Sequence, residues 1–279
     1  MILIRTITEL RNYRETAFKG KSIGFVPTMG ALHLGHLSLI ERSKKDNDLT
    51  IVSIYVNPTQ FNESDDFNNY PRTEEADLLL MQALKPDLVF IPNVDEMYGE
   101  STQLLTLDLN GLDSVMEGRF RNGHFQGVVT IVDKFFGLIF PTRAYFGQKD
   151  FQQLAIIRHL AKILYPTLEI IGCPIIREAD GLAMSSRNIR LLPQERKEAL
   201  LISRVLFEME LGWNKIPFNI LIKRAKAKFE NTKVELEYLE VVDGKTLIAT
   251  ADYTREEMFA CIAARLGKIR LIDNIRLKG

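Results

Sequence analysis

Short apolar runs alternate with longer amphipathic stretches through the first two-thirds of the chain. The apolar runs predict β-strands at residues 22–27, 50–56, 87–92, 144–147 and 168–173. The stretches between them carry apolar residues at helical spacing and predict helices at residues 34–45, 73–84, 127–140 and 151–164. Strands that are apolar almost throughout, and that alternate with helices, are typical of a parallel sheet with helices on both faces.

The pattern changes after residue 175, where helices come first and strands follow. Two helices and then two strand-like runs are expected, in this order, at residues 185–210, 218–230, 234–243 and 258–277. Pro193 lies near the first turn of the first helix, and the sequence DGKT forms a turn between the strand-like runs. We therefore expect an α/β domain over residues 1–175 and a smaller α+β domain over residues 176–279.

Composition narrows the class of protein. The chain has 279 residues, is 46% apolar and 26% charged, and balances 36 Lys and Arg against 36 Asp and Glu. It therefore offers no overall positive field for nucleic acid or an anionic membrane, and no apolar run is long enough for a membrane span. Cys173 and Cys261 lack the spacing of a zinc site and fit free thiols. These features predict a soluble cytoplasmic enzyme with no nucleic-acid or membrane partner.

The unusual polar sequences of the chain directly follow its predicted strands. TMGALHLGH follows the first strand, NPTQF the second, GQKDFQQ the fourth and READGLAMSSRN the fifth. Because ligands bind beyond the carboxyl ends of the strands in open parallel sheets, these four loops predict one active site at one edge of the sheet.

His33 and His36 flank the start of the predicted helix at residue 34. They project from the same side of its first turn, where unpaired backbone N–H groups and the helix dipole attract phosphate. Two imidazole donors there would hold a triphosphate, and Gly30 and Gly35 would let a nucleotide approach the backbone. The alternative is a purely structural histidine pair. Neither a Walker loop nor a G-x-G-x-x-G motif is present.

Two further loops carry groups suited to phosphate. Lys149 is a mobile point charge, whereas Asp150 either accepts ribose hydroxyls, helps to place a metal ion, or caps the next helix. Ser185, Ser186 and Arg187 combine two hydroxyls with a guanidinium that can follow charge moving onto diphosphate. The same serines would also serve as helix caps.

Three glutamines, Gln60, Gln152 and Gln153, add neutral amides to these loops. An amide both donates and accepts hydrogen bonds, so it suits recognition of hydroxyls and a carboxylate. Glutamine is also common on solvated helix faces, and for each residue taken singly the sequence favours that interpretation.

Together the motifs resemble the pantoate–β-alanine ligase family, also called pantothenate synthetases. The resemblance rests on PTMGALHLGH, VNPTQF, YPRT, EGRFRNGHFQGVVTIVDKFF, YFGQKDFQQ and READGLAMSSRN, which occur in this order across most of residues 22–192. The last 85 residues are less distinctive. The H-x-G-H and M-S-S-R pair is also similar, more loosely, to the nucleotide motifs of class I aminoacyl-tRNA synthetases and related nucleotidyltransferases.

The resemblance implies an ATP-dependent ligase that joins (R)-pantoate to β-alanine through pantoyl adenylate, releasing (R)-pantothenate, AMP and diphosphate. It also implies a Rossmann-like first domain, a C-terminal lid, Mg²⁺ with ATP, and a homodimer formed through the first domain. In this family ATP lies along the equivalents of Met29, Gly30, Ala31, Leu32, His33, Leu34, Gly35, His36, Gly147, Gln148, Lys149, Asp150, Ile176, Met184, Ser185, Ser186 and Arg187.

The resemblance also suggests individual roles. His36 is the proton donor, and Gln60 and Gln153 hold pantoate, with Gln60 also near β-alanine. The residues expected to stabilise charge on the phosphates are His33, His36, Lys149, Ser185, Ser186 and Arg187. No Mg²⁺ ligand is assigned, although Asp77 and Asp150 are candidates. Asn122 replaces a proline that is usual in the family.

Three other functions fit some of these features. A nucleotidyltransferase would retain the nucleotide in its product, and a truncated tRNA synthetase would need a tRNA-binding surface that a neutral chain does not offer. A non-catalytic regulator would bind ATP without releasing diphosphate.

Overall fold

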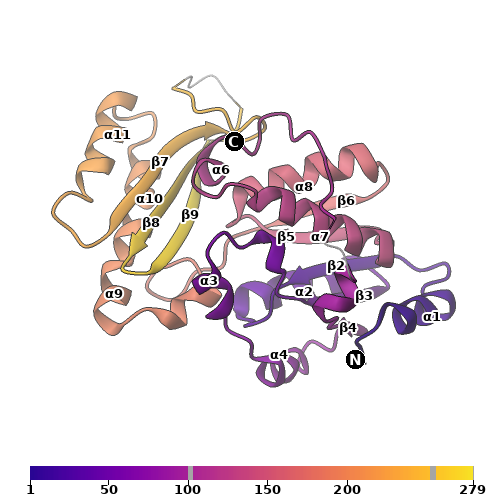
Figure 1. Cartoon of the computed structure of the whole chain (residues 1–279). Helices are drawn as coiled ribbons and strands as arrows, with labels where there is room; N and C mark the ends of the chain where they lie inside the picture. The colour runs from indigo at the N-terminus through magenta and orange to yellow at the C-terminus, as the bar shows by residue number, and fades with distance from the viewer. Residues whose placement is uncertain (100–102, 252–255, 279) are drawn as a thin grey trace.

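The computed structural model describes residues 1–99, 103–251 and 256–278 (Figure 1). Six parallel strands form the first sheet in the order β1-β4-β3-β2-β5-β6. Their bounds are β1 Ile2–Ile4, β2 Ile23–Thr28, β3 Leu49–Ile54, β4 Leu88–Phe90, β5 Arg143–Gly147 and β6 Glu169–Cys173. The predicted parallel sheet is thus confirmed. The sequence did not predict β1, because this edge strand is too short and exposed to show a pattern.

Helices cover both faces of this sheet (Figure 1). On one face α1 Ile7–Ala17, α7 His124–Ile139 and α8 Phe151–Leu164 bury one apolar cluster, and on the other face α2 Leu34–Asp46 and α4 Glu74–Met81 bury a second. Four short helices lie in the connections: η1 Pro58–Gln60, α3 Ser64–Asn68, α5 Val94–Tyr98 and α6 Met116–Phe120.

The C-terminal part consists of helices followed by an antiparallel sheet, β7-β8-β9. Its elements are η2 Ser186–Arg190, α9 Pro193–Glu198, α10 Leu200–Gly212, α11 Phe218–Ala227, β7 Glu235–Asp243, β8 Met258–Leu266 and β9 Ile269–Lys278. The single helix expected at residues 185–210 was wrong. Pro193 clashes with helical backbone before it and therefore begins α9, which leaves residues 186–190 as a separate 3₁₀ turn.

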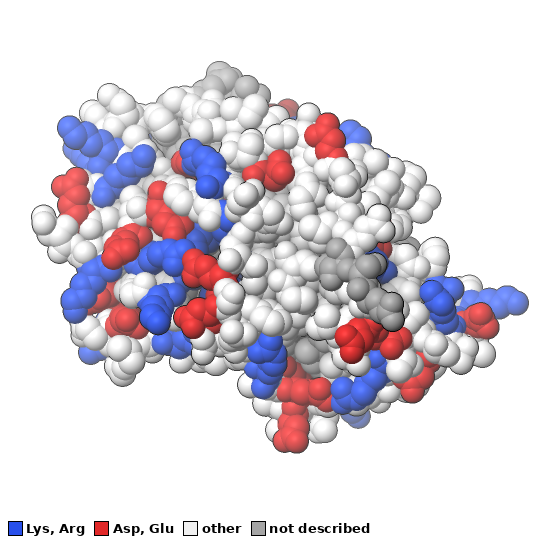
Figure 2. All heavy atoms as spheres, in the orientation of Figure 1, with Lys and Arg blue, Asp and Glu red and all other residues white. Residues whose placement is uncertain are grey.

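The C-terminal sheet packs against the first part of the chain through an apolar cluster. Phe151 of α8 lies against Phe259 of β8 with ring centroids 4.3 Å apart, and Met116, Tyr238 and Cys261 are buried around them. Both cysteines are free. No helix within the described ranges is long and apolar enough to cross a membrane. On the face shown in Figure 2, basic and acidic side chains are interspersed, in keeping with the balanced charge.

Candidate active site

A cavity of about 200 Å³ lies at the carboxyl ends of β2 and β5. β2 pairs with β3 on one side and with β5 on the other, so this is the point where the chain reverses its direction of winding. The predicted site residues that line the cavity are Met29, His33, Gly35, His36, Gln60, Gly147, Lys149, Asp150, Gln153, Ile176, Met184, Ser185, Ser186 and Arg187. Loops that are far apart in the sequence therefore meet in one place.

Five other predicted residues, Gly30, Ala31, Leu32, Leu34 and Gln148, do not line this cavity. The side chain of Leu34 points outward and is 59% exposed. Ala31 and Leu32 are buried, and their N–H groups donate to the two carboxylate oxygens of Asp77 over 2.9 and 2.7 Å.

Asp77 therefore supports the loop that precedes α2. Gly30 and Ala31 both have left-handed backbone conformations, with φ of 78° and 48°, and a turn of this kind needs fixed partners for its N–H groups. The Asp77 carboxylate supplies them and also accepts a hydrogen bond from Thr73 Oγ1. Both of its oxygens are thus engaged inside the protein, so Asp77 is not placed to bind a metal ion.

His33 and His36 lie at the N-terminus of α2 with their rings 4.1 Å apart. The Nδ1 atom of His33 accepts the N–H of Gly35, and the Nδ1 atom of His36 accepts the N–H of His33. These bonds assign the proton of each neutral ring to Nε2. Each histidine thus caps the helix with one nitrogen and keeps the other as a donor.

Burial keeps both rings neutral. It lowers the pKa of His33 to about 4, with a further contribution from the Lys149 charge, and it lowers the pKa of His36 well below its usual value. The two imidazoles are therefore uncharged hydrogen-bond donors that line the site together with Lys149.

The loop after β6 reaches back to the loop before α2. Ser186 Oγ donates to the carbonyl of Ala31 over 2.9 Å, and Ser185 caps η2 by accepting the N–H of Arg187. The Arg187 guanidinium donates to Asp66 of α3 over 2.8 Å. Ser185 therefore serves as a cap and lines the cavity at the same time.

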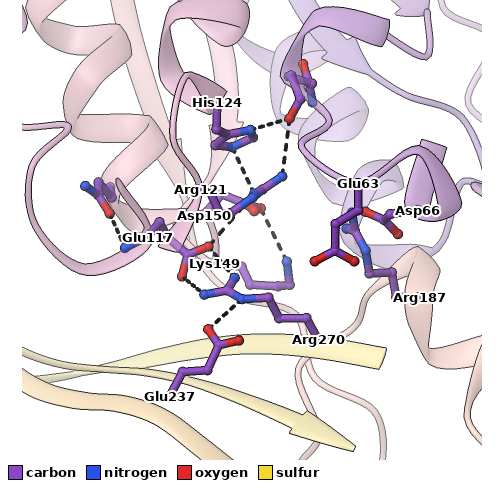
Figure 3. A network of polar contacts seen from close by, with 12 residues as sticks. Glu63, Asp66, Glu117, Arg121, His124, Lys149, Asp150, Arg187, Glu237 and Arg270 are labelled. Atoms are coloured by element: carbon purple, nitrogen blue, oxygen red, sulfur yellow. Dashed lines mark hydrogen bonds and ion pairs between the residues drawn. The ribbon is translucent and has the colours of Figure 1, made fainter. Parts of the chain in front are cut away.

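Lys149 and Asp150 line both this cavity and a second, neighbouring cavity that is described below. These two residues separate the two cavities, and we call them the Lys149 wall. Lys149 Nζ lies 3.4 Å from Asp150 Oδ2 (Figure 3). Burial alone would raise the pKa of Asp150, but the charge of Lys149 and those of Arg187 and Arg121 lower it. Asn274 of β9 fixes the loop by donating to the carbonyls of Gln148 and Lys149 over 2.9 and 3.0 Å.

The opposite end of the cavity combines amides with an apolar wall. Gln60 is buried, and its side-chain carbonyl accepts a hydrogen bond from Asn57 over 3.1 Å. Gln153 lines the cavity, whereas Gln152 is turned away and bonds to the carbonyls of Leu112 and Val115. The apolar wall comes mainly from α7, through Val128, Ile131, Val132 and Phe135, and from Tyr55, which directly follows β3.

Sequence reasoning missed several residues of the site, including Asn57, Asp66, Tyr70 and Asn274. Asn57 and Tyr70 line the cavity and lie in the quoted motifs VNPTQF and YPRT. The motifs therefore pointed to these two residues, but the sequence alone assigned them no function. No local pattern marks Asp66 or Asn274, because their importance depends on contacts with distant residues. Asn122 lies in a turn, and its carbonyl accepts a hydrogen bond from Asn62.

A parallel sheet that gathers a helix N-terminus, a lysine, hydroxyls and an arginine at its switch point is typical of nucleotide-binding α/β enzymes. The family model for pantoate–β-alanine ligase matches residues 2–276, and the chain belongs to that family.

Known relatives are similar to this chain over its whole length. The pantothenate synthetase of Phocaeicola vulgatus is 48% identical and that of Bacteroides fragilis 46% identical, each over 100% of this chain and at least 99% of its own length. The crystal structure of pantothenate synthetase from Thermus thermophilus is 38% identical, with a TM-score of 0.94 over 100% of both chains. A pantoate–β-alanine ligase from Francisella tularensis, solved with β-γ ATP and β-alanine, is 33% identical, with a TM-score of 0.83 over 99% of this chain and 98% of its own.

Proposed function

We propose that the cavity joins (R)-pantoate to β-alanine in two steps, with ATP activating the pantoate carboxylate as an acyl adenylate. The observation that carries this proposal is the convergence of His33, His36, Lys149 and the Ser185–Arg187 loop on one cavity that also has amides and an apolar wall. One end suits a polyphosphate, and the other suits a small branched acid with hydroxyl and carboxylate groups.

In the first step the pantoate carboxylate attacks the α-phosphorus of ATP, and diphosphate leaves. Negative charge grows on the phosphate oxygens, so catalysis depends on donors that already point at them. Lys149 and Arg187 supply positive charge, Ser185 supplies a hydroxyl, and His33 and His36 supply neutral Nε2–H donors. An incoming phosphate raises the imidazole pKa, so that His36 can become protonated and serve as the proton donor, with the departing diphosphate as the acceptor.

We place the carboxyl and hydroxyl groups of pantoate on the amides of Gln60 and Gln153. Its apolar carbons would lie against Val128, Val132 and Phe135 of α7. Asn57 holds the Gln60 side chain in position, so the acid is oriented before it reacts.

In the second step the free amine of β-alanine attacks the acyl carbonyl and AMP leaves. Water competes for the same carbonyl, so the site must exclude it. We propose that residues 176–279 act as a lid over the domain of residues 1–175. The hydrogen bond from Ser186 to Ala31 and those from Asn274 to the Lys149 loop are contacts that such a lid would make when closed.

Mg²⁺ would accompany ATP. No cluster of three or more metal-ligating side chains occurs among the described residues, which suits an ion held mainly by phosphates and water. Asp150, whose lowered pKa keeps it ionised at the cavity wall, is the residue that would complete its coordination. The ion would neutralise phosphate charge. We further propose a cytoplasmic homodimer formed through the first domain.

Diphosphate and AMP release test this function. With ATP, pantoate and Mg²⁺, diphosphate should appear with or without β-alanine, whereas AMP should accumulate only when the amine is present. Lys149→Ala and His36→Ala should slow diphosphate release by about 10²–10³-fold. Lys162→Ala, which removes an exposed lysine from α8, is the matched control. A product that retains the nucleotide would indicate a nucleotidyltransferase, and no diphosphate release would indicate a non-catalytic binder.

A further inference from the structure

The sequence EGRFRNGHF, residues 117–125, has no role in the chemistry above, yet three of its residues, Glu117, Phe120 and Arg121, line a second cavity. This cavity of about 320 Å³ lies between α3, α6 and the β8–β9 hairpin. It shares Lys149, Asp150, Ser185 and Arg187 with the first cavity, so the two adjoin at the Lys149 wall. Five arginines line it: Arg121, Arg187, Arg190, Arg265 and Arg270.

Four of these arginines donate to a carboxylate over 3.0 Å or less. Arg187 and Arg190 share Asp66, and the other two carboxylates are Glu237 beside Arg265 and Glu117 beside Arg270. Arg121 differs from them. Among the described residues its nearest carboxylate oxygen belongs to Glu117, 3.9 Å away, and both oxygens of Glu117 already accept hydrogen bonds from Arg270.

The hydrogen-bond partners of Arg121 are neutral (Figure 3). Its Nη1 donates to Nε2 of His124 over 2.9 Å, and Nδ1 of His124 donates to the carbonyl of Gln60 over 2.7 Å. Burial, followed by the charge of Arg121, lowers the pKa of His124 to about 3, so the ring carries no charge. Burial also lowers the pKa of Arg121 to about 10. The guanidinium is thus a partly desolvated cation whose ion pair with Glu117 is long, 3.9 Å, and whose Glu117 partner is hydrogen-bonded to Arg270, so it can accept a closer anion.

The position of Arg121 indicates which substrate it lies near. His124 ties it to the backbone of Gln60, which we place on pantoate, and not to the N-terminus of α2, where we place ATP. Arg121 therefore lies behind the acyl end of the site, across the Lys149 wall.

We propose that Arg121 binds the carboxylate of the incoming amine substrate, β-alanine. This inference rests on the proposed function. The amine would point through the Lys149 wall toward the acyl carbonyl, and the carboxylate would lie in the second cavity. A single carboxylate matches a single guanidinium that makes no close ion pair, whereas a diphosphate carries more charge than Arg121 alone would neutralise.

The test compares two amines that differ only in this carboxylate, β-alanine and 3-amino-1-propanol. Wild-type enzyme should prefer β-alanine strongly, because Arg121 would be left unpaired with the neutral amine. In Arg121→Gln the kcat/KM for β-alanine should fall about 10²-fold, while that for 3-amino-1-propanol stays the same or rises. Arg121→Lys should recover part of the preference for β-alanine.

Three controls separate this role from damage to the fold. Pantoate-dependent diphosphate release without amine should persist in Arg121→Gln, and the KM values for ATP and pantoate should change far less than kcat/KM for β-alanine. Arg119→Gln removes a nearby arginine that pairs with Glu240 on the outside and should keep the wild-type preference. Equal losses for both amines, or a higher KM for ATP with an unchanged preference, would overturn the inference. Failure of wild-type enzyme to form any amide would instead contradict the proposed function.

Discussion

Asp66 on α3 accepts hydrogen bonds from both Arg187 and Arg190, over 2.8 and 3.0 Å. Burial alone would raise the pKa of Asp66, but these two guanidinium groups lower it overall, so the carboxylate is ionised. The arginine that we assign to the phosphates of ATP is therefore held by an internal anion.

Replacing this anion should strengthen ATP binding. In Asp66→Asn, Arg187 no longer has to leave a charged partner, and the KM for ATP should fall about 3- to 10-fold, because partly exposed ion pairs of this kind contribute on the order of 1 kcal/mol. Steady-state kinetics measures the change. Asp65→Asn is the control, since Asp65 lies 3.9 Å from its nearest cation, Lys268. A higher KM for ATP in Asp66→Asn would mean that Asp66 positions Arg187 and does not compete for it.

Stability should depend on the buried histidines at acidic pH. The pKa of His33 is about 4 in the folded protein against 6.5 as its ordinary value, so between these values the unfolded chain binds more protons. Stability therefore falls as pH drops from about 6.5 to about 4, and His36 and His124 act in the same direction. Urea unfolding at several pH values measures this loss.

His33→Asn isolates one contribution to that pH dependence. Asparagine is a good helix N-cap but does not titrate. In this variant the slope of the unfolding free energy against pH, between pH 4.5 and 6, should therefore decrease by up to about 1.4 kcal/mol per pH unit. An unchanged slope would show that His33 takes up its proton without cost in the folded state.

Two glycines of α7 should respond oppositely to alanine. A Cβ at Gly127 would lie 2.3 Å from the carbonyl oxygen of Thr59, whereas a Cβ at Gly137 has no neighbour closer than 3.8 Å. Gly127→Ala should push η1 and Gln60 away from α7, destabilise the fold by about 1–3 kcal/mol and raise the KM for pantoate. Gly137→Ala should stabilise the helix by up to about 1 kcal/mol. Chemical denaturation of both variants checks this, and a neutral Gly127→Ala would contradict the close contact.

Asp77 should matter for stability and for nucleotide binding. Asp77→Asn places an amide donor against the N–H groups of Ala31 and Leu32, so unfolding free energy should fall by about 1–3 kcal/mol. The KM for ATP should rise, because the loop before α2 loses its support. Glu75→Gln, on the same helix, should change stability by less than about 0.5 kcal/mol. Equal stability of the two variants would show that the loop keeps its shape without Asp77.

Local sequence accounts for much of the fold. Buried parallel strands are apolar throughout and the helices between them are amphipathic, so most elements of the first sheet were predicted within a few residues. The two histidines were correctly placed at a helix N-terminus, because capping depends on neighbours in the chain. By contrast, β1 and the separation of η2 from α9 were missed, since a three-residue edge strand and a 3₁₀ turn leave little periodic signal.

The order of residues along the chain specifies the chemistry available to this protein: which donors, cations and amides follow which strands, and the family that this order indicates. The pairing of these groups became visible only in the folded chain. In the folded chain Asp77 is buried and accepts hydrogen bonds from the loop before α2, and Asp66 accepts a hydrogen bond from Arg187. Arg121 is hydrogen-bonded to the neutral His124. Helix caps and amphipathic faces depend on neighbouring residues and can be read locally, whereas pairing, burial and charge compensation depend on residues that are distant in the sequence and meet only when the chain folds.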